Sequence, residues 1–438
     1  MHMSHHTLAR GSVVVGLVIA LAGASALLPA SDDSSPAPAA AAGANLTTVS
    51  TKDLTQNLVA LRAHLAVQPQ DAHSWALLAQ GYVEQARLTA DPSLYPEAAK
   101  AVQRSLDLES DDNAAAYSAE AALAAARHDF APALESAQTA LHINPLDPVA
   151  LAIRTDALTE LGRYRQAHRS AKAMDRQRPG LAATTRLAYQ AELRGNLRSA
   201  AASFARAAAH SAGGDLAFAL VHRANLERYA GRLKLAAELY RQALRARPDD
   251  ASALAGLARI AVARHDLSRA THRARRVTMF LPLPEYVTLY GELLLTQGNR
   301  EAARDQFALA EANEQREAEQ GVNVYLELAL LNADHGDPAA ALEAARTAWR
   351  FRHTVFTADA LGWALHVNGK DHAALPFAQQ ANELGARSAQ FLHHQGVIEA
   401  HLGLERRARA HLTAALRADP GYSPWQRDNI LQTLRSLV

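Results

Sequence analysis

The sequence predicts an all-α fold made of stacked helical hairpins. Of the 438 residues, 49% are hydrophobic but only 5% are aromatic, and Cys is absent. Closely packed helices suit this composition, whereas a disulfide scaffold or a zinc finger does not. Ala-centred segments recur about every 34 residues, and Gly or Pro separates them at regular places. A fixed period of this length is typical of repeat architectures.

Residues 1–26 are predicted to be an export signal. Arg10 precedes the apolar run from Val13 to Leu28, and Ala24-Ser25-Ala26 fits a cleavage site. This run has 16 residues, whereas a membrane-spanning helix needs about 20. A cleaved signal peptide, a retained membrane tether through residues 13–28 and a misassigned start all remain open. We therefore expect the protein to be secreted, periplasmic or held in the cell envelope.

Residues 27–50 are expected to be a flexible linker, because Pro, Ala and Ser at this density bury no core. A capping helix is predicted at residues 51–71, and a second one at residues 423–438 begins with Pro424. Leucine or isoleucine recurs at helical spacing in both, at Leu54, Leu58, Leu61 and Leu65 and at Ile430, Leu431, Leu434 and Leu437. Such caps cover the apolar ends of a repeat array.

Residues 72–422 are predicted to form ten hairpin units. One column holds Ala in every unit, at Ala98, Ala133, Ala167, Ala200, Ala236, Ala270, Ala303, Ala341, Ala374 and Ala408. Small residues there let two helices approach closely. Gly lies between the two halves of most units, at Gly162, Gly195, Gly231, Gly298, Gly336, Gly369 and Gly403. We expect these glycines to take the left-handed conformation that ends a helix.

These columns resemble the tetratricopeptide repeat (TPR) family, whose period is 34 residues with a W-x2-L-G-x2-Y…A-x3-F…A…P pattern. The matching residues are Trp75, Leu78, Ala79 and Tyr82, the pair Tyr290 and Gly291, and Ala303, Phe307 and Ala310. The resemblance implies a TPR α-solenoid, a right-handed superhelix of about ten helical hairpins. It also implies a concave groove, lined by the first helix of each unit, that binds peptides.

Some units depart from the pattern. Thr155 interrupts a column that is otherwise Ala or Gly, and residues 88–94 lengthen the first unit. About four extra residues within 312–322 predict a prolonged, charged second helix in the seventh unit. An acidic protrusion is expected there, near Glu311 to Glu319.

No catalytic motif is present, and the chain is predicted not to be an enzyme. It lacks H-E-x-x-H, G-x-S-x-G and G-x-G-x-x-G, and without Cys there is no thiol nucleophile. The nearest His cluster, His393, His394 and His401, has only Glu399 at ligand spacing, so neither a metal nor another cofactor is expected. Lys and Arg number 45 against 44 Asp and Glu, which argues against a nucleic-acid partner.

The groove face of the family, carried onto this chain residue by residue, implies the peptide-binding residues. They are Tyr189, Glu192, Asn225, Arg228, Tyr229, Arg259, Glu292, Asn323, Phe356, Asp359, Trp363, His366, His393 and His401. The whole stripe, which also includes Asp334, has eight carboxylates against two arginines, so it favours basic or neutral polar segments. Aromatic and His side chains around Trp363 form the predicted hot spot, unless Trp363 packs on a neighbouring helix.

The sequence thus favours an exported, non-enzymatic scaffold that binds a protein or peptide segment, with a role in assembly or maturation of cell-envelope or secreted proteins. Two alternatives remain open. The segment from Leu58 to Arg87 is similar to the start of TPR domains that hold apocytochromes during cytochrome c maturation. A self-assembling structural protein is the other alternative, through the array ends or the acidic protrusion. Arg far outnumbers Lys, a bias of GC-rich genomes that suggests a bacterial source.

Overall fold

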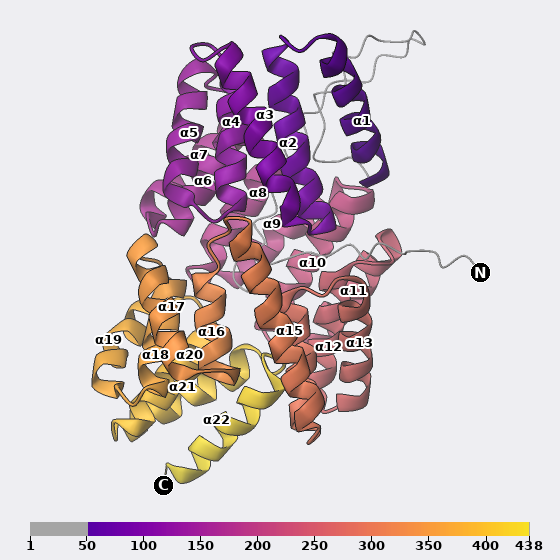
Figure 1. The fold of residues 1–438 in the computed structure, drawn as a ribbon. Helices are drawn as coiled ribbons and strands as arrows, with labels where there is room; N and C mark the ends of the chain where they lie inside the picture. The colour runs from indigo at the N-terminus through magenta and orange to yellow at the C-terminus, as the bar shows by residue number, and fades with distance from the viewer. Residues whose placement is uncertain (1–50, 438) are drawn as a thin grey trace, which may run out of the picture. The chain divides into compact units, whose positions relative to one another are not determined.

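The computed structural model describes residues 51–437, and Figure 1 shows their helices. They form 22 α-helices and one short 3-10 helix, and no strand occurs in this part of the chain. The predicted all-α class is therefore confirmed. The predicted export signal, membrane tether and linker of residues 1–50 lie outside the described residues. No helix from residue 51 onward has both the length and the apolar character that a membrane crossing requires.

The chain divides into two compact units. Within the described residues, unit 1 contains residues 51–186 and 319–322, and unit 2 contains residues 187–318 and 323–437. Unit 1 has α1 (Thr51–Val67), α2 (Ala72–Thr89), η2 (Pro92–Leu94), α3 (Tyr95–Leu108), α4 (Ala114–Ala126), α5 (Phe130–Ile143), α6 (Pro148–Glu160) and α7 (Tyr164–Gln177). Helix α8 (Leu181–Glu192) crosses the boundary between the units.

Unit 2 continues with fourteen helices. They are α9 (Leu197–Ala209), α10 (Gly213–Tyr229), α11 (Leu233–Ala246), α12 (Ala251–Ala263), α13 (Leu267–Phe280), α14 (Pro284–Thr296), α15 (Arg300–Glu319), α16 (Tyr325–His335), α17 (Pro338–Phe351), α18 (Val355–Val367), α19 (Asp371–Ala381), α20 (Ala389–His401), α21 (Glu405–Ala418) and α22 (Pro424–Ser436). Between α1 and α22 the helices alternate as ten consecutive hairpins, each with an even-numbered first helix.

Most hairpin turns contain a residue in the left-handed conformation. Gly supplies it at Gly162, Gly195, Gly231, Gly298, Gly369 and Gly403, as predicted. In two hairpins His128 and His265 take positive φ instead, at 57° and 60°. Gly336 is the exception among the predicted glycines, because its φ is −129°. The Asn332 side chain accepts a hydrogen bond from the Asp337 amide there, and this bond holds the turn without a left-handed residue.

Small side chains form the centre of each hairpin. All ten alanines of the predicted column are at most 1% exposed. Thr155 is equally buried in the other small column, and its hydroxyl donates to the Leu151 carbonyl and lies 2.8 Å from the Ser170 hydroxyl. Thr155 is tolerated at this crossing because its hydroxyl, the only polar atom of the side chain, is hydrogen bonded.

The predicted long helix of the seventh unit is confirmed, since α15 has 20 residues. The prediction of an acidic protrusion near Glu311 to Glu319 is wrong for the face of α15 that carries Glu314 and Glu317. Glu314 and Glu317 are only 5% and 6% exposed. Burial and the nearby carboxylate of Glu327 raise the pKa of both, that of Glu317 to about 8. Tertiary packing turns this face of α15 inward, which charge alone did not indicate.

Candidate functional site

The linker between α21 and α22, residues 419–423, lies across the first helices of unit 2. Its residues and the start of α22 contact α10, α12 and α14 through the ion pairs and hydrogen bonds described below. These first helices carry the stripe that the sequence predicted as a peptide groove. The chain's own linker therefore occupies part of that face.

Arg228, near the end of α10, forms an ion pair with Asp419. Both side chains are buried, and the guanidinium also lies 4.7 Å from the ring centre of Tyr229. Burial alone would lower the pKa of Arg228, but the charge of Asp419 raises it, so the side chain stays a cation. A buried charge of this kind requires a partner, and the linker supplies it.

Arg259 on α12 holds the same linker through its backbone. Its guanidinium donates to the carbonyl oxygen of Tyr422. The Gly421 backbone comes so close that a Cβ atom added there would lie 2.1 Å from the Arg259 carbonyl oxygen. Only glycine fits this approach.

Glu292 on α14 binds the start of α22. Its carboxylate accepts a hydrogen bond of 2.7 Å from the Ser423 hydroxyl and lies 3.3 Å from His335 Nε2. Burial lowers the pKa of His335, but the hydrogen bond and the charge of Glu292 outweigh it and raise the pKa. The hydrogen bond to Glu292 therefore favours the protonated form of His335.

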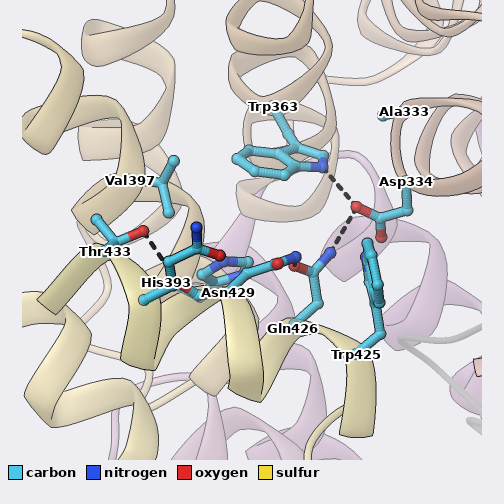
Figure 2. A pocket seen from close by; sticks show the side chains of 10 residues that line it. Ala333, Asp334, Trp363, His393, Val397, Trp425, Gln426, Asn429 and Thr433 are labelled. Carbon is cyan, nitrogen blue, oxygen red and sulfur yellow. Dashed lines mark hydrogen bonds between the residues drawn. The ribbon is translucent and has the colours of Figure 1, made fainter. Parts of the chain in front are cut away.

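Beside this linker lies a polar cavity of about 290 Å³, shown in Figure 2. Side chains from α16, α18, α20 and α22 line it: Ala333, Asp334, Trp363, His393, Val397, Trp425, Gln426, Asn429, Gln432 and Thr433. Asp334 Oδ1 accepts hydrogen bonds from the Trp363 indole N–H at 2.8 Å and from Gln426 Nε2 at 2.7 Å. Helix α22 therefore serves as a wall of the cavity as well as an end of the array.

A cluster of imidazoles packs behind the cavity. The Trp363 and His394 rings stack with centres 4.1 Å apart, and His394 Nδ1 lies 3.0 Å from both carboxylate oxygens of Asp359. His393 is 1% exposed, and its Nδ1 has no hydrogen-bond partner among the described residues. Burial lowers the pKa of His393 well below its usual value, and His394 adds to this. His393 is therefore neutral at physiological pH.

The structure brings the predicted site residues together in unit 2, but it corrects the expectation that they are free. Five are buried, namely Arg228, Glu292, Asp359, Trp363 and His393. Trp363 packs on neighbouring His rings, which was the other interpretation offered above. Arg259 is half-buried and holds Tyr422. A role of the predicted site residues in binding a peptide remains a prediction.

The other predicted residues have partners within the chain or lie half-buried. Asn225 accepts from the Tyr240 hydroxyl, His366 Nδ1 lies 2.5 Å from Asp371, and the Phe356 and Phe391 rings are 5.5 Å apart. Tyr189, Tyr229 and Asn323 are half-buried, and His401 is exposed. Glu192 is also half-buried, and its pKa is raised to about 7 by burial, which the charge of Arg228 offsets in part.

The contribution of α22 to the cavity was not predicted. Residues 423–438 were expected to be an apolar cap, but five of them line the cavity, namely Trp425, Gln426, Asn429, Gln432 and Thr433. A signal was available, because these residues recur at helical spacing and so share one face of a helix. Asp334 was part of the predicted stripe, but it was not singled out.

Ten helical hairpins with a small residue at every crossing define an α-helical repeat protein, a class that presents its helix faces to partners. Residues 227–293 match the family model described as tetratricopeptide repeat. This segment is therefore similar to tetratricopeptide repeats, and the ten consecutive hairpins of residues 72–418 have the all-α solenoid architecture of such repeats. TPR proteins are in general non-catalytic scaffolds for protein–protein interaction.

Several solved structures are similar to this chain at low sequence identity. A TPR protein from Parabacteroides merdae is 16% identical over 59% of this chain and 98% of its own, with a TM-score of 0.34. The human IFIT1 dimer with PPP-AAAA is 13% identical over 83% and 86%, with a TM-score of 0.45. The APC/C hetero-tetramer Cut9-Hcn1 is 13% identical over 88% and 93%, with a TM-score of 0.39. No curated protein matches the sequence.

Proposed function

We propose that the protein is an exported, non-enzymatic scaffold that binds a peptide or protein segment on the first-helix faces of unit 2. The observation that supports this most is that these faces already hold a polypeptide segment, residues 419–423. Charged side chains bind both the side chains and the main chain of that segment. The same chemistry suits a segment from another protein, and the cavity beside α22 is the adjoining place for it.

The role we propose for such a scaffold is the assembly or maturation of cell-envelope or secreted proteins. The support for this location is the export signal predicted in residues 1–26. It is tested by expressing the full chain with a C-terminal tag and identifying the N-terminal residue of the mature protein by mass spectrometry. A start near Leu27, in an envelope or secreted fraction, supports export. An intact Met1 in the cytoplasmic fraction contradicts it.

The binding proposal is tested by affinity capture from envelope and secreted fractions with the full chain. The informative variant is Trp425→Ala with Gln432→Ala, because both side chains line the cavity. Trp425 is half-buried and Gln432 is exposed, so a partner can reach both. Asp428→Ala with Arg435→Ala is the matched control, since both residues are exposed on the same helix. A protein held by the wild type and the control, and lost by the cavity variant, is the expected result.

Two outcomes would count against this proposal. A partner that both variants retain would place binding on another face. If no partner is captured and light scattering shows a mass that rises with concentration, self-assembly becomes the better explanation.

A further inference from the structure

The carboxylate of Asp334 has one oxygen available to a ligand. Both hydrogen bonds that Asp334 accepts, from Trp363 and from Gln426, end on Oδ1. No hydrogen bond from the described residues reaches Oδ2. In Figure 2 the carboxylate is drawn between Trp363 and Trp425. A carboxylate held by two donors on one oxygen presents the other in a fixed place, which favours a donor brought by a ligand.

The surroundings of the cavity are negative. Burial raises the pKa of the neighbouring Tyr422 hydroxyl, and the charges of Asp334, Glu292 and Asp359 raise it further, while the charge of Arg259 lowers it. Arg259 is already bonded to the Tyr422 carbonyl, and His335 lies opposite Glu292. Burial also raises the pKa of Asp334, and the charges of His335 and His394 lower it. A cation beside Asp334 would act in the same direction as these histidines, so a cation is the ligand charge that this carboxylate favours.

The uncharged lining suits the same ligand. Asn429 and Gln432 provide amide oxygens, which accept hydrogen bonds from ammonium or guanidinium groups. The amide oxygen of Gln426 already accepts a hydrogen bond of 3.3 Å from Asn429 Nδ2. Trp425 is a half-buried indole in the wall, and indole rings attract cations through their faces. Gln432 is exposed, so the cavity opens to solvent at this end of α22. A volume of about 290 Å³ accepts the end of a long basic side chain.

We infer that this cavity binds the cationic end of a Lys or Arg side chain from a partner segment, with Asp334 Oδ2 as the acceptor and Trp425 beside the cation. This inference rests on the proposed function, because it names the feature of the bound segment that the scaffold reads. Asp334 and the polar face of α22 thereby select a basic residue.

The test is titration of the full chain with short blocked peptides. Calorimetry and tryptophan fluorescence measure the binding. The peptides are acetyl-Gly-X-Gly-amide with X as Lys, Arg, norleucine or Glu. Norleucine keeps the length of Lys and removes its charge. We expect the Lys and Arg peptides to bind at least about tenfold more tightly than the norleucine peptide, and the Glu peptide not to bind.

Asp334→Asn keeps the shape of the side chain and the acceptor for Trp363, but removes the charge. We expect it to weaken binding of the Lys and Arg peptides at least about tenfold. Asp428→Asn, an exposed residue of α22, is the matched control and should leave binding unchanged. If Asp334→Asn melts early or loses helix, Trp425→Leu replaces it, and weaker binding with loss of the fluorescence response is then expected.

Equal binding of the Lys and norleucine peptides, or unchanged binding by a folded Asp334→Asn variant, would overturn the inference. So would methylguanidinium or methylammonium binding as tightly as the peptides, because the ligand would then be a small amine. These failures are separate from failure of the proposed function. A captured protein that depends on Trp425 and Gln432 would still support the scaffold even if no preference for basic peptides is found.

Discussion

Arg228 on α10 forms a buried ion pair with Asp419, a residue 191 positions later in the chain. Only 5% of the Arg228 side chain and 6% of the Asp419 side chain are exposed. In this structure the pair joins one of the early hairpins of unit 2 to the linker that follows its last hairpin. The face predicted as a free groove is thereby partly filled by the chain itself.

Removing one member of this pair should strongly destabilise unit 2. We expect Arg228→Met to lower the free energy of unfolding by about 3–5 kcal/mol, because Asp419 is then left buried without its counter-ion. Arg228→Met with Asp419→Leu should cost less than the single change. Chemical denaturation followed by circular dichroism measures both. In contrast, Lys100→Met breaks only the exposed pair with Glu97 and should change little. Equal stability of Arg228→Met and wild type would contradict the role of the pair.

Gly421→Ala should displace the linker from Arg259. The added methyl would meet the Arg259 carbonyl oxygen at 2.1 Å, and backbone cannot move as a side-chain end can. A loss of about 1–3 kcal/mol is expected, the usual cost of overpacking. Gly180→Ala is the control, because no atom lies within 4 Å of its added Cβ. Thermal unfolding of the two variants compares them directly, and similar melting temperatures would count against the close approach.

Raising the pH from about 7 to 9 should destabilise the protein through Glu317. Burial, assisted by the charge of Glu327, raises the pKa of Glu317 from 4.5 to about 8. The folded state therefore binds a proton that the unfolded state has already released, so the stabilisation it provides is lost as the pH rises through 8. Each such group changes the unfolding free energy by up to about 1.4 kcal/mol per pH unit.

Glu317→Gln should make this pH dependence less steep, because glutamine does not titrate. Histidines with a lowered pKa do not disturb this measurement. His222, whose pKa is lowered from 6.5 to about 4, changes the unfolding free energy mainly between these two pH values, which lie below the range tested here. Urea denaturation at a series of pH values provides the measurement. Parallel curves for wild type and variant would show that Glu317 does not titrate in this range.

Trp363→Phe should weaken the cavity wall by removing the indole donor to Asp334. The expected cost is about 1–3 kcal/mol, because a half-buried carboxylate loses one of its two donors. Trp75→Phe is the matched control, since its indole donates to the Pro69 carbonyl at an exposed site. Denaturation of both variants tests this, and equal losses would mean that the hydrogen bond to Asp334 contributes nothing.

Much of the fold could be predicted from the sequence, since its signals are local. The Ala column marks the centre of every hairpin, and six of the seven predicted glycines end their helices with positive φ. His128 and His265 show where this reasoning fails, because another residue can take the glycine conformation. The site was predictable only in part. The stripe included Arg228, Arg259 and Glu292, but nothing nearby in sequence indicated that residues 419–423 would cover them.

The sequence by itself determined the period, the hairpins and the helix faces that point inward, because helical spacing and side-chain volume act between residues close together in the chain. The tertiary structure decided what those inward faces hold. Asp419 reaches Arg228, and Gln426 reaches Asp334, only after many hairpins have stacked. Within unit 2 the stacking of successive hairpins, which no single repeat encodes, places the linker between α21 and α22 against α10, α12 and α14.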